Sequence, residues 1–517
     1  MRKSIGYHAA RWDEPLIMQL GSAGERGVLL PACEKQILDE TEDPANTLPK
    51  DLLRETPPEL PEVSQPRVVR HFMRLSQMTM GFDVTPDMSQ GTCTMKYSPK
   101  INDVFANSSK MMQLHPYQDE QTVQGILEII YKLNIYLGEI SGMAGFSFQP
   151  GGGSQAIYAN ACIIRAYHEA NGEGQQRNEI ISTVFSHPVD AAAAHTAGFK
   201  VITLMPERNG YPSVEALQAA LSPRTAGLMI TNPEDTGIFN PHIRKFVDLV
   251  HAAGGLCSYD QANANGILGI ARARDAGFDM CHFNLHKTFS TPHGCIGPGC
   301  GAMGVSTDLV KFLPVPTVSF DGQKYHLEYD HADSIGQVRT FNGNIPAVLR
   351  SYAWIMSLGA EGLKRVAEMA VLNNNYLTKK ISEIKGVSIS YPEGGQRLEQ
   401  TRFSWETLEK DTGVNTEDIR RRIVDYGIQS YHTSHHPIIV PEPFTLEPSE
   451  SFSKEDLDLY VDIFTKVAEE AYEDPELVLT APHRSTTTQV DRSDCDNPDK
   501  WAMTWKAYRR KHLNTGE

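Results

Sequence analysis

Short apolar runs alternate with amphipathic stretches through the middle of the chain. The apolar runs predict strands at residues 180–185, 200–205, 227–232, 255–260, 278–284 and 301–306. Helical spacing between them predicts helices at 213–221 and around 243–250. Strands that alternate with helices favour an α/β fold, in which helices cover both faces of a mostly parallel sheet. Ligands of such sheets bind at the carboxyl ends of the strands.

Helical patterns also flank this central region. Apolar positions recur every three or four residues from Val123 to Leu137, and a helix is expected at 157–169. Past residue 345 we expect a helical stretch to 385, helices at 416–426 and 454–473, and strands at 437–441 and 445–447. The patterns predict four parts: an extended N-terminal arm (1–65), a large domain (66–340), a small α+β domain (341–481) and a polar tail (482–517).

The composition excludes several classes of protein. The 517 residues carry a formal net charge of −16, which argues against a nucleic-acid or anionic-membrane partner. No apolar run is long enough to span a bilayer, and the first residues do not have the pattern of a signal peptide. The eight cysteines are scattered without zinc-site spacing. We therefore expect a reducing, cytoplasmic location and no metal site.

Chemically versatile residues follow the predicted strands at their carboxyl ends. His187 follows the first strand, Thr231 ends the third, Asp260 ends the fourth with Ala262 just beyond it, and Lys287 follows the fifth. Each has a simple structural explanation, such as a helix cap or a histidine with ordinary hydrogen bonds. Because the carboxyl ends of parallel strands meet at one edge of a sheet, we expect these side chains to converge on one site.

Lys287 decides what that site could bind. It follows a buried strand, and a lysine is rarely buried unless it is paired. It either extends to the surface beside the glycine-rich run that comes after it, or it forms a Schiff base with an aldehyde. Pyridoxal phosphate needs such a lysine, an acid at its ring nitrogen and a phosphate seat. The turn Gly151–Gln155, which leads into a helix, is a candidate for the phosphate seat.

Two polar loops fit neither helix nor strand periodicity. They are residues 91–100, which include Thr94, Lys96 and Tyr97, and residues 114–118, which include His115. Long loops of this chemistry often line sites, although each could be a surface connection. We take these four residues as candidates for contacts with the substrate.

Several segments resemble one known family, the pyridoxal-phosphate-dependent glycine dehydrogenase (decarboxylating), the P-protein of the glycine cleavage system, in its subunit 2 form. The resemblance covers most of the chain, from residue 14 to about 482. The segments that carry it are Val68-Val69-Arg70-His71-Phe72, Gly91-Thr92-Cys93-Thr94-Met95-Lys96-Tyr97, His115-Pro116-Tyr117-Gln118, Arg165-Ala166-Tyr167-His168-Glu169, Asn284-Leu285-His286-Lys287-Thr288-Phe289, Pro292-His293-Gly294 and Glu368-Met369-Ala370-Val371-Leu372-Asn373.

The resemblance implies a fold type I, aminotransferase-like architecture and a role for each candidate. Lys287 would be the Schiff-base lysine, His187 would stack on the cofactor ring and Asp260 would contact the ring nitrogen. The other implied cofactor contacts are Gly152, Gly153, Ser154, Gln155, Thr231, Ala262, Asn284 and His286.

The resemblance also implies a reaction and partners. The family decarboxylates glycine and transfers the aminomethyl group to the lipoyl group of a carrier protein. A subunit 1 partner is implied, together with a homodimer or a heterotetramer.

The sequence departs from the family in the loops around the expected site. The family follows its stacking histidine with Gly-Thr-Asn-Pro-Ala, whereas His187 precedes Pro188-Val189-Asp190-Ala191. The glycine run at 294–300 is interrupted by Cys295 and Cys300, and the histidine-rich stretch 431–436 is unlike the family. A paralogous enzyme that transforms a different amino acid is therefore an alternative, and a non-catalytic subunit that binds the cofactor is a third.

Overall fold

The computed structural model describes residues 7–513, apart from 26, 29, 57, 82–83, 90–95, 294–296, 430, 432, 434, 437, 492 and 496. The chain forms two compact units. One combines the N-terminal segment up to Gly81 with the segment from Thr480 onward, and the other runs from Phe82 to Leu479. The expected boundary between a large and a small domain at residue 340 stays a prediction.

The first unit consists of short elements drawn from both segments. They are η1 (Ile17–Gln19), α1 (Lys35–Glu40), η2 (Pro44–Thr47), η3 (Lys50–Leu52), α2 (Gln65–Gln77), α15 (Trp505–Tyr508) and the π-helical turn η8 (Arg509–Leu513). Glu14 ties the arm to α2, because its carboxylate contacts His71 Nδ1 at 2.9 Å and Arg74 Nη1 at 3.1 Å. Helix α2 was not predicted from the sequence.

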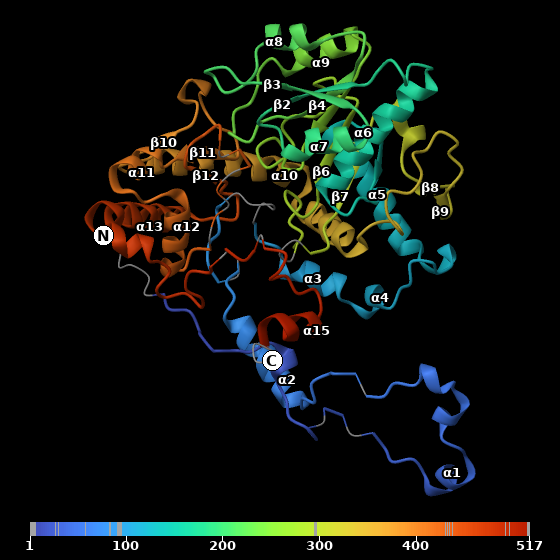
Figure 1. The fold of residues 1–517 in the computed structure, drawn as a ribbon. Helices are drawn as coiled ribbons and strands as arrows, with labels where there is room; N and C mark the ends of the chain where they lie inside the picture. Colours follow the sequence, from blue (N-terminus) through green and yellow to red (C-terminus); the bar gives the residue numbers. More distant parts are fainter. Residues whose placement is uncertain are drawn as a thin grey trace. The chain divides into compact units, whose positions relative to one another are not determined.

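A seven-stranded sheet organises the second unit (Figure 1). Its strands, in spatial order, are β1 (Gly145–Ser147), β7 (Gly301–Val305), β6 (Met280–Asn284), β5 (Leu256–Asp260), β4 (Thr225–Thr231), β2 (Glu179–Thr183) and β3 (Lys200–Leu204). The strands from β6 to β3 are parallel, whereas β7 and β1 are antiparallel to their neighbours. The mostly parallel sheet is confirmed, and β1 is an addition to the six predicted strands.

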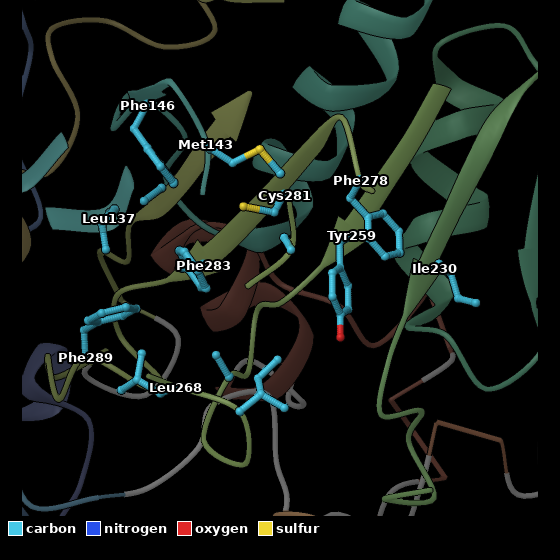
Figure 2. Packing of buried hydrophobic residues seen from close by; sticks show 14 of the residues in the cluster. Leu137, Met143, Phe146, Ile230, Tyr259, Leu268, Phe278, Cys281, Phe283 and Phe289 are labelled. Carbon is cyan, nitrogen blue, oxygen red and sulfur yellow. The ribbon is translucent and has the colours of Figure 1, made fainter. Parts of the chain in front are cut away.

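Helices cover both faces of this sheet, as the alternation of strands and helices predicted. The helices and 3-10 turns of this part of the unit are α3 (Lys100–Ala106), α4 (Ser109–Met112), η4 (Glu120–Thr122), α5 (Gln124–Ser141), α6 (Gly153–Ala170), α7 (Pro188–Thr196), α8 (Val214–Ala220), α9 (Ile243–Ala252), η5 (Thr307–Phe312) and α10 (Ile345–Ile381), of which α5 to α10 pack on the sheet. One core joins α5, α8, α9 and the start of α10 to one face, including Tyr259 and Phe283 (Figure 2). A second core joins α6 and α7 to the other face, through residues such as Met229 and Met280. Neighbouring strand positions therefore belong to different cores.

A smaller antiparallel sheet forms the C-terminal part of this unit. It contains β10 (Ser388–Ile389), β11 (Thr401–Ser404) and β12 (Pro443–Leu446). Around it lie η6 (Pro392–Gly394), α11 (Glu406–Thr412), α12 (Thr416–Ile423), η7 (Val424–Tyr426), α13 (Lys454–Glu473) and α14 (Pro475–Leu479). The strand predicted at 437–441 is wrong. Residues 438–441 form turns, because Ile438 is 95% exposed and Pro441 has no N–H for a ladder, while Pro437 lies outside the described residues.

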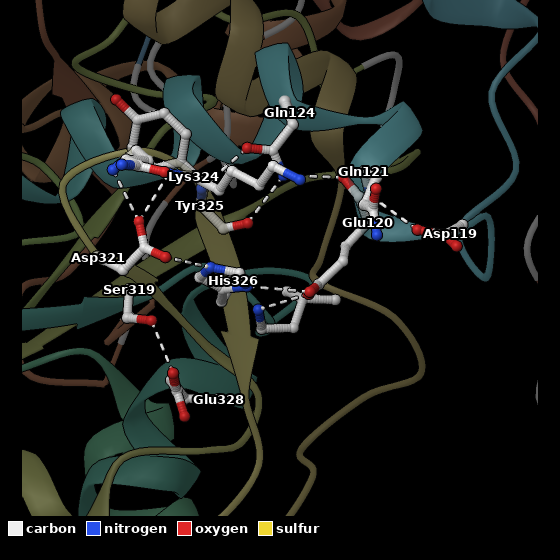
Figure 3. A network of polar contacts seen from close by, with 12 residues as sticks. Asp119, Glu120, Gln121, Gln124, Ser319, Asp321, Lys324, Tyr325, His326 and Glu328 are labelled. Carbon is white, nitrogen blue, oxygen red and sulfur yellow. Dashed lines mark hydrogen bonds and ion pairs between the residues drawn. The ribbon is translucent and has the colours of Figure 1, made fainter.

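A β-hairpin of β8 (Thr317–Phe320) and β9 (Tyr325–Glu328) is fastened to the start of α5 by polar side chains (Figure 3). The Gln124 side chain accepts the Tyr325 N–H and donates to the Tyr325 carbonyl, both at 2.8 Å. Glu120 contacts His326 Nδ1 at 3.0 Å, and this contact lowers the pKa of the Glu120 carboxyl. The hairpin thereby gains a fixed position that its own short strands could not supply.

Candidate functional site

A cleft opens at the carboxyl ends of the parallel strands, with about 500 Å³ of empty space that includes open solvent. Five lining residues were predicted from the sequence: His187, Thr231, Asp260, Ala262 and Lys287. The other lining residues are Pro233, Asp235, Asn263, Glu399, Gln400, His435 and Glu447. The strand ends therefore converge as expected, and a polar wall from the C-terminal part of the unit faces them.

Asp260 is fixed by the strand register. It pairs with Thr231 of β4 on one side and with His282 of β6 on the other. Its side chain is almost fully buried, and Oδ1 accepts the Ala262 N–H at 2.8 Å. His282 Nε2 lies 3.3 Å from the same oxygen, and burial lowers the pKa of that imidazole. A backbone donor thus holds the Asp260 side chain in the cleft, with a neutral histidine beside it.

His187 caps the helix that comes after β2. Its Nδ1 accepts the Val189 N–H at 3.1 Å, so the proton of the neutral ring lies on Nε2. Burial, opposed by the charge of Asp260, lowers the pKa of His187 to about 4. The ring is therefore uncharged at neutral pH. The His435 ring lies 4.7 Å away, centroid to centroid, on the opposite wall.

Lys287 lies on a tight turn directly after β6. Its N–H donates to the Asn284 carbonyl at 3.0 Å, and Cys300 N–H donates to His286 Nδ1 at 3.2 Å. Burial lowers the pKa of His286 to about 3, so this ring remains a neutral acceptor. His286 and Asn284 do not line the cleft. They hold the turn that presents Lys287 to it.

The glycine-rich turn leads into α6 beside Asn284. A Cβ on Gly153 would lie 2.8 Å from Asn284 Nδ2, so a side chain there would force the Asn284 amide to move. Gln155 Oε1 accepts the Gly151 N–H at 2.7 Å and closes the turn. The exposed guanidinium of Arg339 lies against Gly151, where a Cβ would overlap it. A helix N-terminus and a guanidinium together make a seat for an anion.

The candidates for substrate contact lie outside the cleft lining. Lys96 is buried, pairs with Glu450 at 3.0 Å and donates to the Thr288 carbonyl at 3.0 Å, next to Lys287. Tyr97 and His115 are exposed. Thr94 lies outside the described residues. Their contact with a substrate stays a prediction.

Acidic side chains dominate the wall opposite Lys287. Asp235 accepts from Arg402 Nη2 at 2.9 Å and contacts His435 Nδ1 at 3.2 Å. Glu399 is 2% exposed, and its Oε2 has no hydrogen-bond partner within the described part of the chain. Burial, and then the charge of Glu447, raise the pKa of Glu399 to about 8. Glu399 is therefore largely protonated at neutral pH.

Sequence reasoning missed this wall and Arg339. Glu399, Gln400, His435 and Glu447 are far from the strand ends in sequence, and they reach the cleft only through the packing of the C-terminal part of the unit, whereas Asp235 lies just beyond the end of β4. Arg339 follows no periodic pattern that would have singled it out. Asp190, buried on α7 with its Oδ2 3.5 Å from Thr231 Oγ1, was noticed only as a departure from a motif.

Comparisons with known proteins agree with this architecture. Residues 366–480 match the family model described as glycine dehydrogenase, C-terminal domain. The chain is 46% identical to a probable glycine dehydrogenase (decarboxylating) subunit 2 of Pyrococcus horikoshii, over 97% of this chain and 98% of that protein. A protein of the same description from Caldanaerobacter subterraneus is 43% identical, over 92% of this chain and 96% of that protein.

The fold has a solved counterpart. A crystal structure of glycine decarboxylase (P-protein) of the glycine cleavage system, in inhibitor-bound form, superposes with a TM-score of 0.69. It is 18% identical in sequence, and the match covers 85% of this chain and 100% of that chain. This structural match confirms the fold type I architecture that the sequence predicted.

Proposed function

We infer the function of this chain from one premise: it belongs to the glycine dehydrogenase (decarboxylating) subunit 2 family. We propose that it binds pyridoxal phosphate, decarboxylates glycine and passes the aminomethyl group to the lipoyl group of a carrier protein. The single observation that best supports this function is the convergence of Lys287, Asp260 and His187 on one cleft. A subunit 1 partner and a homodimeric or heterotetrameric assembly are parts of the same proposal.

The residues present fit this cofactor. Lys287 Nζ is the amine that would hold its aldehyde carbon, and the start of α6 with Arg339 would hold its phosphate. Gly153 supports that assignment, because a side chain there would collide with Asn284 and close the approach. When bound, pyridoxal phosphate supplies a protonated ring that accepts the electron pair left by departing CO2.

Each side chain of the site has a distinct task in this proposal. Asp260, buried and held by the Ala262 N–H, would keep a proton on the ring nitrogen through its negative charge. His187 would lie flat against the ring, and its neutral state avoids a second positive charge beside that nitrogen. Lys287 would afterwards be free to move protons at the reacting carbon.

The wall of Glu399, Asp235 and Glu447 would face the substrate. Asp235 is already paired with Arg402, and Glu399 is largely protonated at neutral pH, so neither of these two groups adds a free charge, and the described residues of the wall offer no cation. The substrate carboxylate would gain no strong ion pair there, which favours its loss as uncharged CO2 over its retention.

The polarity of the same wall favours a second candidate function. Glycine has no side chain, yet the cleft adds the polar groups of Gln400 and Asn263 beyond the cofactor residues. An amino acid with a small polar side chain could use them. The alternative is therefore a family member that decarboxylates such an amino acid.

Two further properties bear on the setting of the enzyme. Among the described residues all six cysteines are free thiols, which supports the proposal of a reducing, cytoplasmic compartment. Within the same residues, none of the helices combines the length and apolar character needed to cross a membrane.

Absorption spectroscopy tests the proposal. The purified protein with added pyridoxal phosphate should develop the band of a lysine-bound cofactor. Lys287→Ala should abolish this band, whereas Lys311→Ala, a change at an exposed lysine, should retain it. Glycine should shift the band, and CO2 should be released once a lipoyl carrier is added.

The other outcomes are equally informative. A band that ignores glycine but responds to an amino acid with a polar side chain would select the second candidate. No band in the wild-type protein, or a band that survives Lys287→Ala, would refute the assignment of the cofactor site.

A further inference from the structure

The histidine-rich stretch 431–436 contributes one side chain to the lining of the cleft. That side chain is His435, whose ring lies 4.7 Å, centroid to centroid, from the ring of His187. His435 Nδ1 lies 3.2 Å from Asp235 Oδ2, and the His435 side chain is 16% exposed. A part of the sequence that is unlike the family therefore supplies an imidazole to the site, and the proposed function gives this imidazole no task.

Asp235 fixes which nitrogen of His435 carries a proton. The fully buried guanidinium of Arg402 donates from Nη2 to Asp235 Oδ2 at 2.9 Å, and such a partner favours the ionised form of a carboxyl group. An ionised carboxylate only accepts hydrogen bonds, so His435 Nδ1 is the donor to Asp235. In the neutral ring, Nε2 is then left without a proton. Neutral His435 is therefore an acceptor and a base at Nε2, oriented by a third group as a catalytic imidazole is.

The two histidines of the cleft offer opposite groups to a ligand. His187 Nδ1 accepts the Val189 N–H at 3.1 Å, so the remaining nitrogen of its neutral ring, Nε2, is a donor. His435 has the reverse arrangement, with its donor directed at Asp235. A substrate group that donates hydrogen bonds can therefore use the ring of His435 but not that of His187.

The charges around His435 favour a donor that is also a cation. Although Asp235 is paired and Glu399 is largely protonated, the carboxyl groups of Asp260 and Glu447 also line the cleft. The Glu447 side chain accepts from the amides of Asn263 and Asn265, and such hydrogen bonds favour its ionised form. Among the described residues of the lining, Lys287 is the only lysine or arginine. The ammonium group of an amino acid therefore matches this wall in charge and in hydrogen bonding, whereas a carboxylate does not.

We propose that His435 receives the ammonium group of the incoming amino acid and removes one of its protons, with Asp235 as the positioning residue. An ammonium has no lone pair, so the substrate nitrogen must lose a proton before it can act as a nucleophile. The N–H bond breaks, its electron pair stays on the substrate nitrogen, and the proton moves to His435 Nε2. Asp235 stabilises the imidazolium, which returns the proton to solvent before the next substrate enters. This inference rests on the proposed function, which makes an amino acid the substrate.

Nitrogen NMR of protein labelled with ¹⁵N-histidine, without added cofactor, tests the acceptor. The His435 signals, identified by their loss in His435→Gln, should show a ring protonated on Nδ1 at pH 7.5. Glycinamide, which carries an ammonium group but no carboxylate, should shift the Nε2 signal of His435. Glycolamide, with a hydroxyl group in place of the ammonium, should leave that signal unmoved. A ring protonated on Nε2 instead, or an Nε2 signal that ignores glycinamide, overturns the proposal.

The rate at which glycine shifts the absorption band of the cofactor-loaded protein tests the proton transfer. In His435→Phe the second-order rate constant at pH 7 should fall on the order of 100-fold, the lower end of what a positioned base contributes. The deficit should shrink as the pH rises, because more of the glycine then enters as the free amine. His435→Gln keeps an acceptor but cannot take up a proton, so it should be as slow as His435→Phe.

Two comparisons separate proton transfer from a structural effect. His331→Gln changes a half-buried histidine outside the cleft lining and should keep the wild-type rate. The pH dependence is evaluated as the ratio of wild-type to variant rate constants, because the same titratable and charged groups face position 435 in every variant. These groups are His187, Asp235, Asp260, Lys287, Glu399, Arg402, His436 and Glu447.

The outcomes distinguish this proposal from the proposed function. A deficit that is independent of pH, or a wild-type rate in His435→Gln, overturns the proton transfer. A cofactor band that is present in wild type but lost in His435→Phe would show that His435 serves the cofactor, and overturns the proposal as well. If wild type itself develops no band, the proposed function fails, while the NMR shift with glycinamide still decides whether the wall receives an ammonium group.

Discussion

Replacing Glu399 with Gln should stabilise the protein, and the gain should depend on pH. The Glu399 pKa rises from 4.5 to about 8 on folding, so the folded state resists its ionisation. Below pH 4.5 the group is protonated in both states and contributes no penalty. As the pH rises toward 8, Glu399 ionises in the unfolded state but stays protonated in the folded state. The free energy of unfolding of the wild type therefore falls, whereas that of the glutamine variant does not change through this group.

The size of the effect is set by the shift in pKa. Each pKa unit corresponds to about 1.4 kcal/mol. At pH 7, about 2.5 units above the unfolded pKa, the variant should gain about 3 kcal/mol, and the gain should level off above pH 8. The gain in the free energy of unfolding equals the cost of keeping the Glu399 carboxyl group buried in the cleft wall at that pH.

Urea unfolding at pH 4.5, 6 and 7.5, followed by tryptophan fluorescence, measures this difference, because Trp405 is fully buried in the same part of the unit. Glu470→Gln is the contrasting control. Glu470 is similarly buried but is paired with Arg422, whose Nε lies 2.8 Å from its carboxylate, so the same substitution should lower stability. A gain for Glu399→Gln that is independent of pH, or a loss at pH 7.5, would refute the reasoning.

Two further changes test the cofactor seat and one ion pair. Gly153→Ala should weaken pyridoxal-phosphate binding about tenfold or more in a fluorescence titration, because the new methyl group meets Asn284; unchanged affinity would contradict the role given to the turn. His251→Asn should lower the thermal midpoint most below pH 6, because the 2.7 Å bond to Asp279 raises the His251 pKa and its stabilisation fades as the pH rises through that value. A deficit that grows with pH in calorimetry would contradict this sign.

The sheet could be predicted because its strands are buried on both faces. Such strands appear as continuous apolar runs, and five of the six predicted ones overlap the observed parallel strands while the sixth is antiparallel β7. Edge strand β1 escaped notice because it has only three residues. Helix α7 escaped because its run of alanines carries no apolar periodicity, although Pro188 at its start is a common helix signal.

The residues of the candidate site also fall into two groups: those that local sequence patterns predict and those that they do not. His187, Thr231, Asp260, Ala262 and Lys287 could be predicted because parallel strands bring their ends together whatever the connecting segments contain. The opposite wall depends on packing across long sequence separations, which no local pattern encodes. The positions of its acidic groups, and the burial that shifts their pKa values, depend on how the three-stranded sheet packs against the cleft.

The first unit joins residues that are synthesised far apart in time. Thr486 Oγ1 donates to the Met78 carbonyl at 2.8 Å, a contact between residues 408 positions apart. At roughly 5–20 residues per second, a ribosome needs about 20–80 s to cover that distance. Helix α2 is therefore synthesised long before its partner Thr486, and the whole segment from 82 to 479 is made between them. The earlier segment of this unit can therefore complete its contacts only after the rest of the chain between them has been made.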